Sequence, residues 1–239
     1  MRQWWREFAG LVLPVACGGC GRPRTELCAG CGDALGGGEP RRVRPSPEPP
    51  GLPVVHAAAP YENAVRALLL AHKERGALTL ARPLGGALAA AVRAGPGRSG
   101  EGGPLLLVPV PSARRSTAAR GHDPVRRIAL TASAALRRSG TPARVLPVLR
   151  QRRRVADQAG LRAVQRRANL AGALEAVPGA ERLLAAGRVV LVDDLMTTGA
   201  TLAEAARAVG PAVPRTGAYR PFWAAVVAAS PSAFEINRN

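Results

Sequence analysis

Residues 189–201 of this 239-residue chain read VVLVDDLMTTGAT. Four apolar residues in a row are typical of a strand buried in a parallel sheet, and the segment 200–209 (ATLAEAARAV) predicts a helix after the turn. Asp193 and Asp194 then lie at the carboxyl end of the strand, which is where ligands bind in open α/β sheets. The stretch therefore predicts a strand, a tight turn and a helix, with two neighbouring carboxylates at the ligand-binding edge.

The turn is suited to a phosphate group. Successive backbone N–H groups at the start of a helix are free to bind an anion, and the helix dipole favours negative charge there. Gly199 allows a ligand to approach the backbone closely, and the threonine hydroxyls add donors. The residues expected to surround the phosphate are Leu195, Met196, Thr197, Thr198, Gly199, Ala200 and Thr201.

The two carboxylates require a different partner. They would repel a phosphate, whereas a carboxylate can accept two hydrogen bonds from a vicinal diol. We therefore expect Asp193 and Asp194 to bind sugar hydroxyls, so that the whole pocket holds a ribose 5-phosphate. A strand–turn–helix with a coincidental pair of aspartates is the alternative.

All four cysteines lie in CGGCGRPRTELCAGC, as Cys17, Cys20, Cys28 and Cys31. Two C-x-x-C pairs at this spacing can bring four thiolates around one tetrahedral Zn²⁺. Four protein ligands leave no open position on the metal, so we expect the zinc to be structural. Two disulfides are the alternative, which a reducing cytoplasm would disfavour.

The chain is long enough for one α/β domain with a small appendage. We expect an N-terminal helix and a zinc-ribbon-like module in residues 1–37, a stiff proline-rich connector in 38–53, and the main domain in 54–239. Strands that alternate with helices predict a mostly parallel sheet flanked by helices. The expected strands are 105–111, 144–151, 187–194 and one within 218–229; the expected helices begin near 61, after Gly76, at Asp123–Pro124 and at 200.

The charge is strongly positive and unevenly distributed. Lysine and arginine total 34 against 16 acids, a net +18, and residues 114–167 alone hold 15 arginines and two acids. A concentration of this kind implies an anionic partner. No apolar run reaches the ~18 residues of a membrane span. We expect a cytoplasmic protein without a membrane partner, whose first residues form an amphipathic helix.

Stretch 189–201 resembles the phosphoribosyl diphosphate (PRPP) loop of type I phosphoribosyltransferases: four apolar residues, two acids, two variable residues, then T-T-G-x-T. Other segments resemble the competence-related ComF family. They are the cysteine cluster, YENAVRALLLAHKERG, VPVPSARRSTAARGHDPVRRIAL and QRRRVADQAGLRAVQRRANLAGAL. The chain departs from that family at His122 and Asp123, where an aromatic residue and Asn are usual, and in having a proline-rich segment where many members carry further cysteines.

The resemblance implies a type I phosphoribosyltransferase-like fold that binds PRPP with Mg²⁺, with Asp193 and Asp194 as the catalytic pair and the acceptor unidentified. It also implies a DNA-uptake helicase as a partner. The residues that it assigns to the pyrophosphate and to a flexible closing loop are Arg114, Arg115, Arg120, Lys73, Gln158 and Arg166.

Two other functions remain open. One is a competence or DNA-processing factor that binds single-stranded DNA through its arginine-rich face without catalysis. Residues 114–167 contain no Phe, Tyr or Trp, so such a factor would contact the DNA backbone rather than stack on bases. The other is a regulator in which PRPP or a nucleotide binds and nothing reacts.

Overall fold

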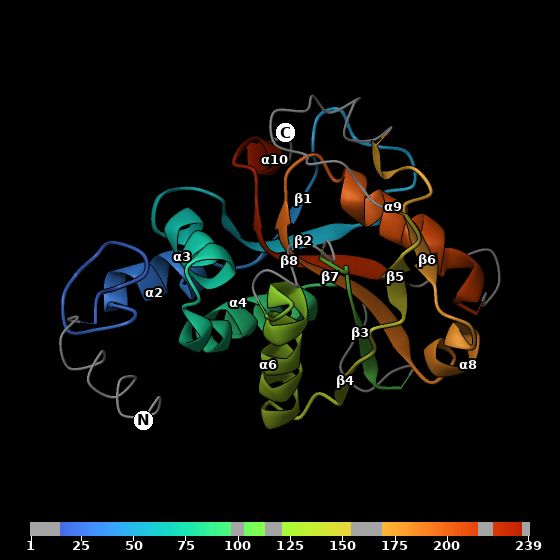
Figure 1. The fold of residues 1–239 in the computed structure, drawn as a ribbon, viewed down its shortest axis with the longest axis horizontal. Coiled ribbons are helices and arrows are strands. Elements are labelled where there is room, and N and C mark those ends of the chain that lie inside the picture. Colours follow the sequence, from blue (N-terminus) through green and yellow to red (C-terminus); the bar gives the residue numbers. More distant parts are fainter. Residues whose placement is uncertain (1–14, 97–102, 113–120, 154–168, 215–221, 236–239) are drawn as a thin grey trace.

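The computed structural model describes residues 15–96, 103–112, 121–153, 169–214 and 222–235. A six-stranded sheet forms its centre, and helices cover both faces (Figure 1). The strands are β1 (Arg41–Val43), β2 (Val55–Pro60), β3 (Leu105–Pro109), β4 (Ala143–Val145), β5 (Leu149–Gln151), β6 (Leu174–Ala176), β7 (Arg188–Met196) and β8 (Trp223–Ala229). The helices are α2 (Ala29–Gly36), α3 (Asn63–Glu74), α4 (Ala81–Arg93), α6 (Pro124–Arg138), α8 (Ala180–Leu184), α9 (Ala200–Val209) and α10 (Ser232–Glu235), with 3-10 turns η1 (Leu78–Leu80) and η2 (Gly210–Ala212).

The order of strands in the main sheet is β1-β2-β8-β7-β3-β4. All neighbours in this sheet are parallel except β1, which pairs antiparallel with β2. A second sheet contains only β5 and β6, paired antiparallel. The expected α/β architecture with a mostly parallel sheet is therefore confirmed.

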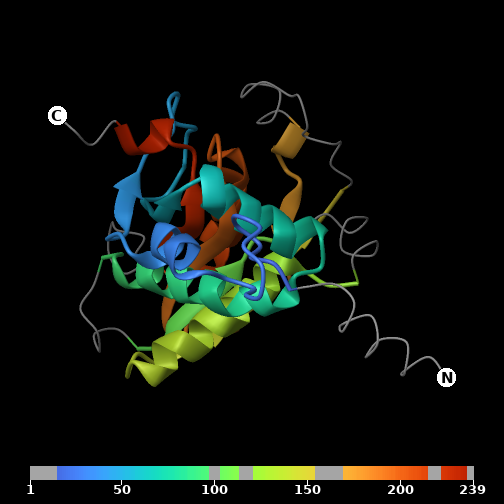
Figure 2. The same ribbon diagram turned by 90° about the vertical axis from the view of Figure 1, so that its left-hand side faces the viewer.

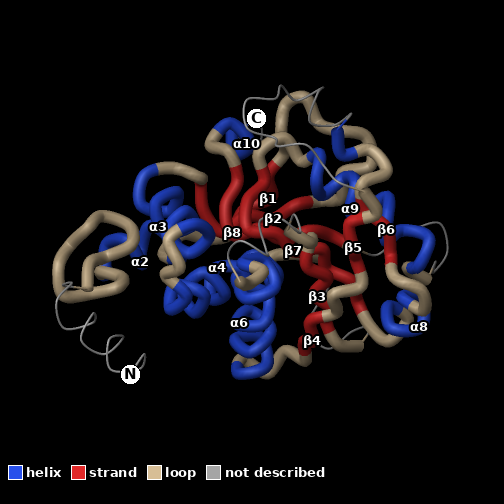
Figure 3. Tube along the Cα trace, in the orientation of Figure 1, coloured by secondary structure: helices blue, strands red, loops and turns tan. Residues whose placement is uncertain are grey.

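Each face of the sheet packs against its own set of helices, because the side chains of a strand alternate between faces. On one face Val190 and Val192 of β7 belong to a core with α3, α4 and α6. On the other face Val189 and Leu191 pack with α8 and α9. Figure 2 shows the first set of helices in front of the sheet, and Figure 3 shows the strands in red between the two helical layers.

Helix α6 begins as the sequence predicts. The side chain of Asp123, the N-cap residue, accepts a hydrogen bond from the N–H of Arg126 at 3.2 Å, and Pro124 occupies the first turn. Proline is favoured there because its missing N–H would have no helical partner. The cap fixes where the segment that follows β3 enters the helix.

Helices α4 and α6 cross closely at Gly85. A Cβ atom at this position would clash with the Oγ1 of Thr131 and would lie 2.7 Å from its Cβ. We expect Gly85→Ala to lower the free energy of unfolding by about 1–3 kcal/mol, because the crossing would have to open. Gly86, on the exposed side of the same helix, has nothing within 4 Å.

Gly86→Ala is the matched control. It should raise the stability by about 0.5–1 kcal/mol through helix propensity alone. Urea unfolding of both variants measures the contrast. Equal effects at Gly85 and Gly86 would contradict the close α4–α6 crossing.

The structure corrects three details. The expected strand 144–151 is two strands in different sheets, interrupted at Pro147, which has no N–H to donate to a ladder. The strand expected at 187–194 continues to Met196, so the turn begins at Thr197. The proline-rich segment 38–53 includes strand β1, whose Val43 is buried against the sheet.

Two other expectations concern the N-terminal helix and membrane-spanning segments. The N-terminal amphipathic helix falls in residues 1–14, outside the described part of the structure. None of the helices in the described residues combines the length and the apolar character that crossing a membrane would require.

Candidate functional site

The acids and the threonine turn lie at the end of β7, next to the point where the helices that follow neighbouring strands change faces. Strands β3 and β7 are neighbours, yet β3 leads to α6 on one face and β7 leads to α9 on the other. Ligands of open α/β sheets bind at the carboxyl ends of such a pair of strands. The chain continues beside β7 after β3 ends, because the N–H of Val110 donates to the carbonyl of Val192 at 2.9 Å.

Both aspartates are buried at the end of β7. Asp193 is 9% and Asp194 5% exposed. The N–H of Asp194 donates to the Oδ1 of Asp193 at 2.8 Å, and the Nζ of Lys73 lies 3.0 Å from the Oδ2 of Asp194. Lys73 is in the last turn of α3, so the structure brings together the acids and the one lysine that the sequence assigned to ligand binding.

The carboxyl of Asp193 is held in an unfavourable setting. Burial raises its pKa well above the ordinary value, and the negative charge of Asp194 raises this pKa further. The ammonium of Lys73 and the N–H of Asp194 act in the opposite direction without reversing the shift. The two buried acids, with the ammonium of Lys73 beside Asp194, form a polar centre suited to accepting and donating hydrogen bonds.

The turn after β7 is closed by Gly199, the N-cap of α9. Its φ of +72° lies in the left-handed region, which glycine adopts readily. Thr197 is exposed, whereas Thr198 and Thr201 are half-buried. Gly199, the N-cap residue, has no side chain that could accept a hydrogen bond from the first amides of α9.

The proline-rich segment covers one side of the same turn. A Cβ atom added to Gly199 would lie 3.1 Å from the methyl groups of Leu52 and 3.3 Å from the Cγ of Pro45. The proline-rich segment thus packs against the turn through Pro45 and Leu52, in addition to supplying β1. Sequence reasoning missed this role, because a proline-rich composition indicates only an extended chain.

Substitution of Gly199 tests this packing. We expect Gly199→Ala to cost about 2–3 kcal/mol of stability, from the left-handed conformation and the contact with Leu52 together. Gly172 has a φ of +67° and nothing within 4 Å, so Gly172→Ala should show only the conformational cost of about 1–2 kcal/mol. Thermal unfolding of the two variants separates the conformational cost from the cost of the contact with Leu52. A larger loss of stability for Gly172→Ala than for Gly199→Ala would contradict the packing of the proline-rich segment on the turn.

A hydrogen bond joins the described ends of the segment between β3 and α6. The hydroxyl of Ser112 donates to the Oδ1 of Asp123 at 3.2 Å, which ties the end of β3 to the start of α6. His122 lies beside His72 of α3, with ring centroids 6.0 Å apart. His72 is 1% exposed, its Nδ1 faces the carbonyl of Ala77 at 3.3 Å, and burial lowers its pKa.

The remaining positions assigned to the pyrophosphate and to the closing loop lie outside the described residues. They are Arg114, Arg115, Arg120, Gln158 and Arg166. The last described residues before those segments are Ser112 and Arg153. The roles of these five side chains stay predictions.

The four cysteines come together at the N-terminal end. Their sulfur atoms all lie within 4.8 Å of one another, and the Sγ atoms of Cys20 and Cys28 are 3.6 Å apart. A tetrahedral zinc with Zn–S bonds near 2.3 Å places its sulfurs about 3.8 Å apart. The N–H of Cys28 also donates to the Sγ of Cys17 at 3.4 Å. This group could hold a metal ion such as zinc.

The chemistry of the donors fits a cation. Burial acts to raise the pKa of Cys17, but N–H groups of Cys28, Cys20 and Gly19 outweigh it and lower this pKa to about 6. Burial and the neighbouring cysteines raise the pKa of Cys31. Four thiolates would repel each other, so only a bound cation stabilises the fully deprotonated set. At Gly19 a Cβ would lie 2.7 Å from the Sγ of Cys31, so the first knuckle requires glycine.

Three of the four cysteines are part of the main core. Cys17, Cys28 and Cys31 pack with helices α3 and α4 in one buried cluster. A Cβ on Gly18 would lie 2.9 Å from Leu80, which shows how closely the first knuckle rests on the chain after α3.

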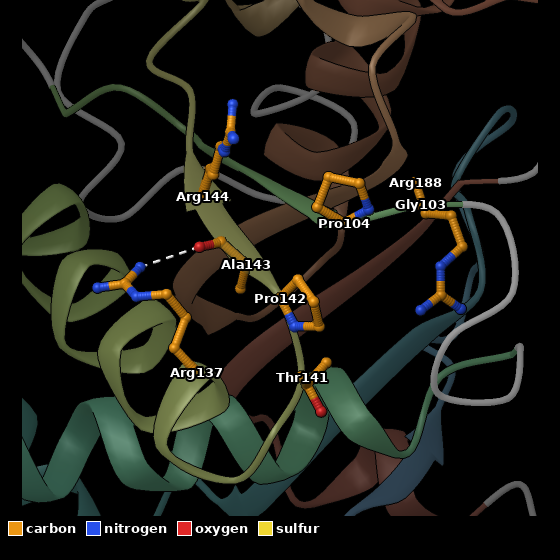
Figure 4. Close-up of a pocket in the computed structure, with 8 residues that line it drawn as sticks. All are labelled: Gly103, Pro104, Arg137, Thr141, Pro142, Ala143, Arg144 and Arg188. Atoms are coloured by element: carbon orange, nitrogen blue, oxygen red, sulfur yellow. Dashed lines mark hydrogen bonds between the residues drawn. The ribbon is translucent and has the colours of Figure 1, made fainter.

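A hollow lies at the other end of the sheet from the acids. It has a volume of about 660 Å³ and is lined at the amino ends of β3, β4 and β7. Figure 4 shows the lining residues Gly103, Pro104, Arg137, Thr141, Pro142, Ala143, Arg144 and Arg188. The acids and the threonine turn are therefore identified by chemistry and topology, not by the size of a cavity.

No protein-family model matches the chain, and no curated protein matches it. The resemblances to phosphoribosyltransferases and to the ComF family accordingly stay predictions, carried by the quoted motifs.

Proposed function

We propose that this protein is a ComF-like member of the type I phosphoribosyltransferase fold that binds PRPP with Mg²⁺ at the end of β7. The observation that carries the proposal is that two buried aspartates at the end of β7 lead, through one turn, into a helix start with glycine at its N-cap, and that β7 is the parallel neighbour of β3. Asp193 and Asp194 accept hydrogen bonds from the ribose hydroxyls, and residues 197–201 bind the 5-phosphate.

Lys73 has two uses in this site. Its ammonium group neutralises part of the charge of the two acids, which would otherwise repel an anionic ligand. It also fixes the carboxylate of Asp194 in one orientation, so that the diol meets a preorganised acceptor.

The proposed reaction is transfer of the phosphoribosyl group. The bond between ribose C1 and the pyrophosphate oxygen breaks, pyrophosphate leaves with the electron pair, and C1 becomes oxocarbenium-like. An acceptor lone pair then forms the new bond to C1, and the acceptor releases a proton. Mg²⁺ neutralises charge on the pyrophosphate when it is bound, and Arg114, Arg115 and Arg120 supply further positive charge on that side. Gln158 and Arg166 lie on the segment proposed to close over the site.

The zinc of the cysteine module is proposed as structural. All four cysteines would be ligands, so the metal has no open position for substrate. The module instead anchors α3, which carries Lys73 in its last turn.

Isothermal titration with PRPP tests the proposal. We expect saturable binding that requires Mg²⁺, weaker binding of ribose 5-phosphate, and none of a hexose 6-phosphate, since the acids are matched to a ribose diol. Pyrophosphate release, screened against nucleobases and amines, then tests transfer. Absence of PRPP binding in the metal-loaded protein would contradict the proposal, and binding without release for every acceptor would favour the regulator.

A further inference from the structure

Helix α6 carries an unusual distribution of charge. It contains Arg126, Arg127, Arg137 and Arg138 and no acidic residue, and all four arginines are exposed. At 3.6 residues per turn they fall within an arc of about 120° around the helix, opposite its buried side. Exposed Arg144 of β4 follows at the end of α6. We call these five arginines the α6 basic face.

The five arginines are not compensated by acids. Arginine ion pairs in the described residues include Arg44 with Glu48, Arg150 with Glu175 and Arg207 with Glu204, and none of these pairs involves the α6 basic face. Arg137 donates instead to the neutral hydroxyl of Ser133 at 2.7 Å and to the carbonyl of Ala143 at 2.9 Å. Within the described residues, no ion pair therefore neutralises the charges of this face.

The spacing of the arginines suits a linear polyanion. Arg126 and Arg137 are eleven residues apart, as are Arg127 and Arg138, so two pairs are separated by about 16 Å along the helix. That length spans about five phosphates of one nucleic-acid strand in B form. Arg137 and Arg144 both line the hollow at the amino ends of the sheet; in Figure 4 the guanidinium of Arg137 turns towards the carbonyl of Ala143, and the side chain of Arg144 points away from it.

We propose that the α6 basic face binds the phosphodiester backbone of a nucleic acid. Arginine matches phosphate with two parallel hydrogen bonds, which makes it well suited to this partner. An acidic protein fits less well, because stable protein interfaces need apolar anchors and Leu130 is the one large exposed apolar residue on α6. The helix carries no aromatic side chain, so binding depends on the backbone and not on base sequence.

Fluorescence anisotropy with the full, metal-loaded chain tests this surface. The probes are labelled single-stranded and double-stranded oligonucleotides of one length, titrated between about 50 and 200 mM salt. Four or five phosphate contacts predict a slope of log K against log[salt] near −3 for single strands, and a steeper slope for duplex. Comparison of the two dissociation constants shows whether single-stranded or double-stranded nucleic acid is the preferred ligand.

The decisive variant is R126Q/R127Q/R138Q, which spares Arg137 because it anchors β4. We expect its slope to be shallower by about 2 and its affinity at about 50 mM salt to be at least about tenfold lower. The matched control, R44Q/R66Q/R150Q, removes the same charge elsewhere and should keep the slope of the unmodified protein. Equal losses in both variants, no binding at about 50 mM salt, or equally tight binding of polyglutamate would overturn the proposal.

Discussion

Removal of the metal should destabilise the whole molecule. We expect a strong chelator to lower the free energy of unfolding by at least about 4 kcal/mol, the linkage contribution of a metal present at about 1,000 times its dissociation constant. For a chain of this size that corresponds to a fall of about 8–16 °C in Tm. The reason is structural: Cys17, Cys28 and Cys31 share one buried core with α3 and α4.

Scanning calorimetry and metal analysis check this prediction. Cys28→Ser should have the same lowered Tm as the chelated protein, and chelator should then have no further effect on it. A protein that contains no bound metal, or one whose Tm does not respond to chelation, would contradict the metal centre. Metal uptake should also weaken at low pH, because the thiols must be deprotonated to bind.

Asp193→Asn should have two opposite effects. We expect it to raise the stability at neutral pH by about 1 kcal/mol, because the amide keeps the acceptor for the N–H of Asp194 and removes a buried charge. It should also weaken PRPP binding by about 10- to 100-fold, from loss of a charge-assisted hydrogen bond worth about 1.5–3 kcal/mol. An acid whose charge lowers the stability of the fold but strengthens ligand binding is expected to be a functional residue.

The pH dependence has a definite sign. The pKa of Asp193 is raised in the folded protein above its unfolded value of about 3.9. The folded state therefore binds more protons, and stability falls as pH rises from the unfolded value through the raised one. The gain in stability of Asp193→Asn over the unmodified protein should be smallest near pH 4 and largest at neutral pH. A stability difference that does not change with pH would contradict the raised pKa.

Glu204 is the matched control, since it is a buried acid with the reverse environment. Burial acts to raise its pKa, but Arg207 and the N–H of Leu174 outweigh this and lower it. Its charged form supports the fold above the unfolded pKa, and this support is lost as pH falls. We expect Glu204→Gln to cost about 1.5–3 kcal/mol at neutral pH and to leave PRPP binding unchanged. A Glu204→Gln variant that is more stable than the unmodified protein would contradict the opposite pKa shifts of Asp193 and Glu204.

Much of the fold follows from local sequence signals. The apolar runs of β3 and β7 predict buried parallel strands, and Asp123 followed by Pro124 predicts the start of α6. The spacing of the cysteines predicts their cluster. Each of these signals lies within a short stretch of chain, so no knowledge of distant contacts is needed to interpret it.

Other elements depend on contacts that a local pattern does not contain. Strand β2 reads VHAAAP, which has little strand propensity, and it forms because β1 and β8 pair with it on both sides. The ion pair between Lys73 and Asp194 joins residues 121 positions apart. The contact of Leu52 with Gly199 likewise depends on where the proline-rich segment folds back.

A crystal structure of the metal-loaded protein with Mg²⁺ and PRPP tests the central claim most directly. We predict that the ribose hydroxyls will lie within hydrogen-bond distance of Asp193 and Asp194, with the 5-phosphate against the amides of residues 197–201. Ligand bound in the hollow beside Arg137 and Arg188, or a phosphate with no contact to the threonine turn, would contradict the account.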